Sequence, residues 1–300
     1  MSKPSKPAPK IPAKHAYLIL AHKNDLTFKT LIKMLDHPDN DIYIHMDLKN
    51  STYKTQTTQK IAPRSHIYHV TRTKTTWGSY SLVNAELSLL KAATKNHHYT
   101  YYHLLSGGDL PIKTQTKIHN FFNQNYGKEF IKFQSPIFQY QNRIRYYYPF
   151  QEKTGKAHNI FIKLLNKSTL EIQKTLHINR NQNQKFQKGT NWFSITDNLA
   201  RYIIDHEAWI QKTFKHTFCC DEIFLQTLVD NSDFKNNLYR KKYDNNPLAA
   251  MRLIDWHRGT PYTFKISDFD EIKHSKCLFA RKFDSKSDQR IIKKIQESFC

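Results

Sequence analysis

Cysteine, acidic residues and long apolar runs are all scarce in this sequence of 300 residues. Four cysteines, with no regular spacing, are too few for a disulfide framework and form no zinc-binding pattern. Their scarcity favours a reducing compartment. The sixteen histidines likewise show no paired metal-ligand spacing. No stretch approaches the roughly eighteen consecutive apolar residues of a membrane-spanning helix, so none is predicted.

Positive charge, by contrast, is abundant: 47 lysines and arginines against 25 acids give a formal net charge of +22. Such a charge predicts attraction to an anionic partner, which can be a nucleic acid, a membrane surface or a phosphate-bearing ligand. The charge is spread along the whole chain, and no helix-turn-helix, RNA-binding or zinc module is recognisable. Residues 1–14 alternate lysine and proline without an apolar signal-peptide core, which predicts a disordered basic arm.

From His15 onward, short apolar runs alternate with segments of helical periodicity, as in α/β proteins with a mostly parallel sheet. No linker divides residues 15–300, so we expect one domain. Ligands of such sheets bind beyond the carboxyl ends of the strands, where Asp47 and the loop 106–111 are predicted to lie. The predicted strands are 16–21, 41–47, 65–70, 99–105, 128–133, 192–195, 251–256 and 278–284, and the predicted helices are 26–35, 81–95, 160–176, 197–205 and 287–298.

Two segments have a distinct polar character. Residues 139–150 (QYQNRIRYYYPF) interleave arginine and tyrosine, a pattern that suits base stacking, sugar stacking or one aromatic face of an ordinary helix. Residues 177–189 are rich in asparagine and glutamine and are predicted to form a loop.

The stretch 219–228 (CCDEIFLQTL) admits two interpretations. Locally it reads as a helix start in which Asp221 is the cap and Glu222 a first-turn acid, and this is the commoner use of such acids. Alternatively, Glu222 projects into a cleft and acts as a general base.

A set of motifs decides between the two interpretations. The chain resembles the core-2/I-branching family of glycosyltransferases, which groups β-1,6-N-acetylglucosaminyltransferases with peptide O-xylosyltransferases. The matching segments occur in the family's order over most of the chain from His15 to Asp288: AYLILAH, IHMD, WGSYSLVNAELSLL, YYHLLSGGDLPIK, KGTNWFSIT, DEIFLQTL and LFARKFD.

This resemblance implies a GT-A-type α/β domain, a nucleotide-sugar donor, inversion at the anomeric carbon and a catalytic base at Glu222. It also implies metal-free catalysis, in which basic side chains stabilise the departing diphosphate. Lys282 matches the lysine of the closing motif, and Arg258 is the expected second cation, with Arg252 as the alternative. We interpret the Asp-x-Asp sequences 39–41 and 268–270 as chance matches, because neither follows a strand.

Position in the motifs suggests the remaining contacts. The expected nucleotide-binding residues are His22, Asp47, Trp77, Gly78 and Ser79. The expected donor and acceptor pocket comprises Ser106, Gly107, Asp109, Arg143, Trp192, Asp221 and Trp256.

The expected reaction is transfer of a sugar, N-acetylglucosamine in the first instance, from a UDP-sugar to a hydroxyl of a saccharide or lipid-linked saccharide, with no metal cofactor. Animal members of the family are lumenal, membrane-anchored and rich in disulfides. The departures from that pattern predict a bacterial cytoplasmic enzyme that builds a surface polysaccharide and contacts the anionic inner face of the membrane peripherally. The competing hypotheses are a basic nucleic-acid-binding protein and a catalytically inactive sugar-binding relative.

Overall fold

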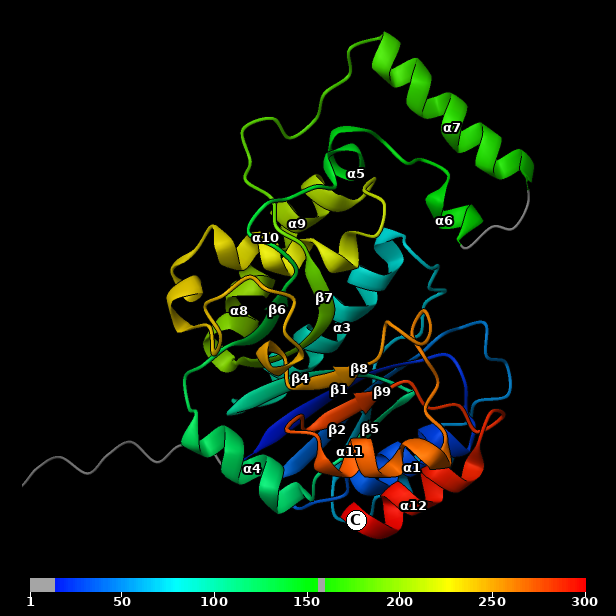
Figure 1. Cartoon of the computed structure of the whole chain (residues 1–300), viewed down its shortest axis with the longest axis vertical. Coiled ribbons are helices and arrows are strands. Elements are labelled where there is room, and N and C mark those ends of the chain that lie inside the picture. Colours follow the sequence, from blue (N-terminus) through cyan, green and yellow to red (C-terminus); the bar gives the residue numbers. More distant parts are fainter. Residues whose placement is uncertain (1–13, 156–159) are drawn as a thin grey trace, which may run out of the picture.

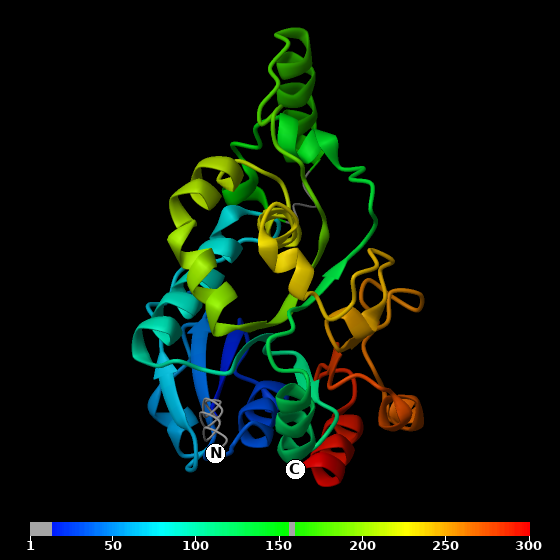
Figure 2. The ribbon, with the colours of Figure 1, turned by 90° about the vertical axis from the view of Figure 1, so that its left-hand side faces the viewer.

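The structure, a computed structural model, describes residues 14–155 and 160–300. The predicted basic arm, apart from Lys14, lies outside the described residues. Figure 1 shows the helices and strands along the chain, and Figure 2 shows the same ribbon from the side.

Within the described residues, six strands form the central sheet in the spatial order β3-β2-β1-β4-β7-β6. β1 pairs in parallel with β2 and β4, and β2 with β3, whereas β7 runs antiparallel to both of its neighbours. This confirms the expected α/β fold class with a mostly parallel central sheet flanked by helices. The strands are β1 (His15–Ala21), β2 (Asn40–Met46), β3 (His66–His69), β4 (Tyr101–Ser106), β6 (Phe130–Phe133) and β7 (Gly189–Thr196).

The strand β1 is apolar on both faces because both faces are covered by helices. Successive side chains of a strand point to opposite faces. Leu18 therefore joins the core beneath α3, whereas Ile19 joins the core beneath α1 and α12. Figure 1 shows α1, α11 and α12 on one side of the sheet and α3, α8, α9 and α10 on the other.

The predicted helices are confirmed to within two residues at each end, although α2, α4, α6, α9 and α11 were not predicted. α1 begins where the side chain of Asp25 accepts a hydrogen bond from the amide of Phe28 (3.1 Å). The helices are α1 (Leu26–Met34), α2 (Gln56–Gln59), α3 (Tyr80–Asn96), α4 (Gln115–Gln124), α5 (Gln141–Arg145), α6 (Gln151–Thr154), α7 (Ile160–Thr175), α8 (Asp197–Asp205), α9 (Glu207–Phe214), α10 (Phe224–Asp230), α11 (Phe269–His274) and α12 (Gln289–Phe299).

A second sheet, with the order β5-β9-β8, is built from β5 (Asp109–Pro111), β9 (Phe279–Arg281) and β8 (Arg252–Ile254). The sequence had predicted a loop over 106–111, but its last three residues pair with β9 as a strand. β9 lies between the other two strands. Its pairing with β5 brings residues 279–281 close to the carboxyl end of β4, which β5 follows in the sequence. The second sheet thereby completes the wall of the cleft described next.

Candidate active site

A cavity of about 1550 Å³ lies at the carboxyl ends of β1, β2 and β4, where the sequence placed the ligand site. His22, Asp47 and Ser106, which follow or end these strands, all line it. The cavity exceeds the usual size of a site for one small molecule, so it has room for two substrates.

Glu222 is the last residue of a 3-10 turn, η1 (Cys220–Glu222), that leads into α10. Its carboxylate lines the cavity and is about one third exposed (33%). The Oε2 atom lies 3.2 Å from both Arg143 Nη1 and Lys188 Nζ. Among the described residues no hydrogen bond reaches Oε1, so this oxygen can accept a proton from a bound ligand.

Asp221 does not cap α10, contrary to the simpler interpretation of its motif. The residue at the cap position is Ile223, and no side chain caps the helix. Asp221 is instead buried at the edge of the cavity, where burial and then the charge of Glu222 raise the pKa of Asp221 to about 7. Its neighbour Glu86, on α3, is fully buried, and burial raises the pKa of that carboxyl as well.

Arg281 and Lys282 also line the cavity, at the end of β9. The guanidinium of Arg281 donates a hydrogen bond to Asp109 (2.7 Å) and one to the hydroxyl of Ser106, and it lies 4.6 Å from the ring centroid of Trp192. Asp109 is therefore a buried support for Arg281, not a lining residue as predicted, whereas Ser106 and Trp192 do line the cavity.

Arg258 also lines the cavity, but its guanidinium already binds three carboxylates, those of Asp255, Asp268 (2.7 Å) and Glu271 (2.7 Å). A diphosphate would have to compete with these acids. The alternative cation, Arg252, is buried and donates to the carbonyls of Ala250 and Phe193, outside the cavity. Arg252 therefore does not face the cavity, whereas Arg281 lines it beside Lys282.

Of the five residues expected to bind the nucleotide, His22, Asp47 and Trp77 line the cavity. Burial and the cations Lys23, Lys282 and Arg281 lower the pKa of His22, which leaves its imidazole neutral at pH 7. Asp47 accepts hydrogen bonds from Thr75 Oγ1 (2.6 Å) and from the amide of Lys49 (2.8 Å). Burial acts to raise the pKa of Asp47, but these bonds outweigh burial and lower it.

Three aromatic side chains line the cavity: Trp77 and Trp256, which are 46% and 51% exposed, and the more buried Trp192. Exposed rings of this kind provide flat surfaces for a sugar or a base. Gly78 and Ser79 do not line the cavity, contrary to prediction. Gly78 has a positive φ of 72°, and the buried hydroxyl of Ser79 donates to Glu152 (2.9 Å) on α6.

Gly107 packs against the first strand and does not line the cavity either. A Cβ atom at this glycine would lie 3.1 Å from the Cβ of Ala21. Arg143 does not line the cavity either, but its guanidinium donates a hydrogen bond to Glu222, which does. Three cavity lysines, Lys49, Lys132 and Lys188, were not among the predicted site residues, although Lys188 begins the KGTNWFSIT motif.

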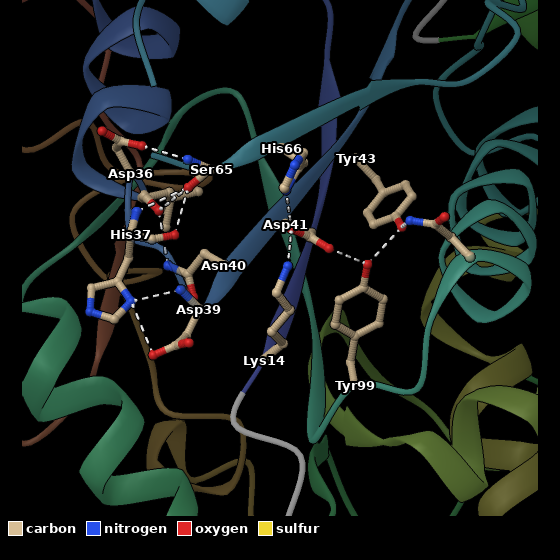
Figure 3. A network of polar contacts seen from close by, with 12 residues as sticks. Lys14, Asp36, His37, Asp39, Asn40, Asp41, Tyr43, Ser65, His66 and Tyr99 are labelled. Carbon is tan, nitrogen blue, oxygen red and sulfur yellow. Dashed lines mark hydrogen bonds and ion pairs between the residues drawn. The ribbon is translucent and has the colours of Figure 1, made fainter. Parts of the chain in front are cut away.

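The two Asp-x-Asp sequences occupy structural positions. Figure 3 shows Asp41 at the start of β2, where it accepts hydrogen bonds from Lys14 (3.1 Å) and Tyr99 (2.6 Å). This is the end of the sheet away from the cavity. Asp268 pairs with Arg258. In the part of the chain that the structure describes, no cluster of three or more histidine, cysteine or acidic side chains could hold a metal ion.

The sequence model of the Core-2/I-Branching enzyme family matches residues 15–276. This chain belongs to the Core-2/I-Branching enzyme family. The resemblance based on seven motifs is thereby confirmed, and with it the assignment to a family of glycosyltransferases.

Two curated relatives of this family member are named xylosyltransferases. Xylosyltransferase 2 of Rattus norvegicus is 24% identical over 302 residues, which cover 92% of this chain and 32% of that protein. Xylosyltransferase sqv-6 of Caenorhabditis elegans is 26% identical over 311 residues, which cover 95% of this chain and 36% of that protein. The chain thus spans about a third of the length of these relatives.

A solved structure, that of mouse Xyloside xylosyltransferase 1 in its apo form, aligns with 88% of this chain and 96% of its own, with a TM-score of 0.37 and 7% identity. Within the described residues of the family member, none of the helices is both long and apolar enough to cross a membrane.

Proposed function

We propose that this chain is an inverting glycosyltransferase that moves a sugar from a UDP-sugar to a saccharide hydroxyl in one displacement. The observation that supports the proposal most directly is the position of Glu222, whose carboxylate lines the same cavity as the cations Arg281 and Lys282. Glu222 Oε1 takes the proton of the acceptor hydroxyl, and the hydroxyl oxygen attacks the anomeric carbon. The bond from that carbon to the diphosphate breaks, and UDP leaves with the electron pair.

Arg281 and Lys282 stabilise the negative charge that develops on the leaving diphosphate. Charge-assisted hydrogen bonds from fixed cations are strongest where water is limited, and Asp109 and Trp192 hold Arg281 in place. The proposal includes no metal, as the family resemblance implies. Arg143 and Lys188 orient the base by binding its other oxygen, Oε2.

The donor is proposed to be UDP-N-acetylglucosamine, on the basis of the family resemblance. UDP-xylose is a second candidate, because the curated relatives are named xylosyltransferases. The acceptor is proposed to be a saccharide of a bacterial surface polysaccharide, free or lipid-linked.

A thermal-unfolding screen tests the proposal and separates the two donors. A ligand present at one hundred times its Kd stabilises the folded state by about 2.7 kcal/mol. We expect UDP and one of the two UDP-sugars to raise the unfolding temperature, and the same UDP-sugar to release UDP when an acceptor is present. If a UDP-sugar raises the unfolding temperature but no acceptor brings about UDP release, the protein is instead an inactive sugar-binding relative. DNA binding that salt abolishes, with no effect of UDP, would favour a nucleic-acid-binding protein.

Peripheral contact with an anionic membrane is a further part of the proposal, and α7 supports it. Figures 1 and 2 show this helix projecting at the end of the molecule opposite α12. Lys167 and Lys174 are also exposed on it, which suits the headgroups of anionic lipids. The exposed apolar side chains of α7 and the residue after it are Leu164, Leu165, Ile172 and Leu176.

A further inference from the structure

Lys132 occupies an irregular position on the edge strand β6. The pairing register between β6 and β7 shifts between Ile131 and Phe133, where Lys132 alone lies opposite residues 190–192 of a bulged β7. Bulges occur often beside active sites. Ile131 and Phe133 both pack into the core on one face of β6, so the side chain of Lys132 points to the other face, where it lines the cavity.

The bulge is held in place from two sides. The side-chain amide of Gln226 donates to the carbonyl of Lys132 (3.3 Å) and to that of Thr190 (2.7 Å). Gly189 faces the same carbonyl so closely that a Cβ atom there would lie 1.7 Å from it. The position of Lys132 is therefore fixed by the fold.

The ammonium of Lys132 lacks a counterion. The residue is only 9% exposed, and within the described chain no hydrogen bond or ion pair reaches its Nζ atom. Burial, followed by repulsion from Lys188, lowers the pKa of Lys132 to about 8. Glu222 attracts this ammonium from a distance, but its Oε2 atom is already bound by Arg143 and Lys188. The Nζ atom is open to the cavity, and a bound anion there would offset the loss of hydration that burial of this side chain causes.

Lys188 stands beside it in a fixed orientation. Its ammonium donates to Gln134 Oε1 (2.8 Å), pairs with Glu222 (3.2 Å) and lies 4.9 Å from the ring centroid of Tyr140. Two ammonium groups therefore lie on the same side of the cavity as Glu222, on strands and loops distinct from β9, which carries Arg281.

We propose that Lys132 and Lys188 bind an anionic substituent of the acceptor, a carboxylate or a phosphate, beside the catalytic carboxylate. The inference rests on the proposed function, because it assigns this side of the cavity to the acceptor. An anion between the two ammonium groups gives Lys132 its missing hydrogen bonds. It also anchors the acceptor within reach of Glu222, which positions the hydroxyl that reacts. The acceptor is accordingly an acidic saccharide, with either a uronic acid or a sugar phosphate next to the accepting sugar.

Binding to UDP-saturated enzyme tests this assignment with three probes: D-glucuronate, glycerol 1-phosphate and neutral D-glucose. We expect one or both anions to bind the wild-type protein and glucose to bind much more weakly. The relative strength of the two anions separates a carboxylate acceptor from a phosphate acceptor. Lys132→Met, which keeps the apolar stem, should weaken anion binding by at least about tenfold, the loss of a charged hydrogen bond. Lys132→Arg should retain part of it.

Lys128→Met is the matched control, since it removes the same charge from an exposed position just before β6. We expect it to bind the anions as the wild type does. Stabilisation by UDP alone is measured first for every variant, and its retention in Lys132→Met shows that this variant is folded.

The outcomes separate the two proposals. If UDP does not stabilise the wild type, the proposed function fails. If UDP binds but neither anion does, or if Lys132→Met binds them unchanged, the acceptor subsite is refuted and the function stands. If Lys132→Met weakens the binding of UDP as strongly as it weakens the binding of the anions, Lys132 contacts the donor and the acceptor subsite is again refuted.

Discussion

The carboxylate of Glu222 and the ammonium of Lys188 lie 3.2 Å apart, although 34 residues separate them in the sequence (222 − 188). The same oxygen, Oε2, also accepts from Arg143 at 3.2 Å. One side of the carboxylate is thus fixed by two cations, and the other side faces the cavity. This arrangement suits a base that receives its proton at one defined oxygen.

Glu222→Gln should leave the fold and UDP binding intact but reduce sugar transfer by about 10²-fold or more, because only the proton acceptor is lost. The measurements are UDP release with acceptor and thermal stabilisation by UDP. Glu171→Gln, at an exposed position on α7, is the control and should transfer at the wild-type rate. A Glu222→Gln enzyme with near wild-type transfer would show that Glu222 is not the base.

Lys282→Ala and Arg281→Ala should each lower turnover by about 10²-fold, the usual effect of removing one donor that stabilises transition-state charge. Arg258→Ala is the informative comparison. The sequence predicted an equal loss for it, but its guanidinium is engaged by Asp255, Asp268 and Glu271, so we expect a smaller effect on turnover. An equal loss in steady-state kinetics would restore Arg258 as a diphosphate ligand.

Transfer should persist in EDTA and gain little from added Mn²⁺ or Mg²⁺, because two fixed cations are proposed to stabilise the diphosphate. The measurement is the initial rate of UDP release after dialysis against EDTA, with and without each metal. Loss of activity in EDTA with recovery in Mn²⁺ would contradict the mechanism. Attention would then turn to Asp47, the carboxylate that lines the cavity on the nucleotide side.

Asp221→Asn should change how stability depends on pH. Between the ordinary carboxyl pKa of 3.8 and the raised value of about 7, folded Asp221 keeps a proton that the unfolded chain has released. The contribution of Asp221 to the free energy of unfolding therefore falls as pH rises through this window. The free energy of unfolding of Asp221→Asn, relative to that of the wild type, should therefore increase from pH 4 to pH 7 by at most about 1.4 kcal/mol per pH unit. Above pH 7 this difference should stay constant. Urea unfolding at several pH values measures this, and a difference that is already constant below pH 7 would contradict it.

Binding to anionic vesicles should occur at low salt and weaken at high salt, at about 1 kcal/mol per basic residue near the surface. Deleting residues 1–14 and changing Ile172 and Leu176 to Gln should each weaken it. Ile137→Gln, a change at another exposed apolar residue, is the control. Co-sedimentation provides the measurement. Equal binding by every variant would place the contact elsewhere, and no binding at low salt would refute it.

The alternation of strands and helices was predictable because β1, β2 and α3 have strong apolar patterns that local sequence reveals. α4 was missed because its polar sequence QTKIHNFFNQ has few apolar residues. Strand β5 was missed because three residues following a glycine pair read as a turn.

Motifs led to Glu222 and Lys282, and both line the cavity, whereas their roles in the reaction stay predictions. The partners of these residues depend on contacts between distant segments, which a single sequence does not reveal. Arg143 meets Glu222 across 79 residues, and Arg281 meets Asp109 across 172. Lys132 faces an irregular stretch of β7, and no local pattern in FIKF reveals this pairing.

The pairing of β9 with β5 also affects the order in which the molecule can be completed during its synthesis. All six strands of the central sheet precede residue 197, so that sheet can form while the ribosome is still translating the remainder. Arg281 and Lys282, which complete the cation wall, come from the last strand to emerge. A nascent chain can therefore hold a folded sheet and still lack one wall of its cleft. Products of premature termination before β9 should accumulate as inactive fragments.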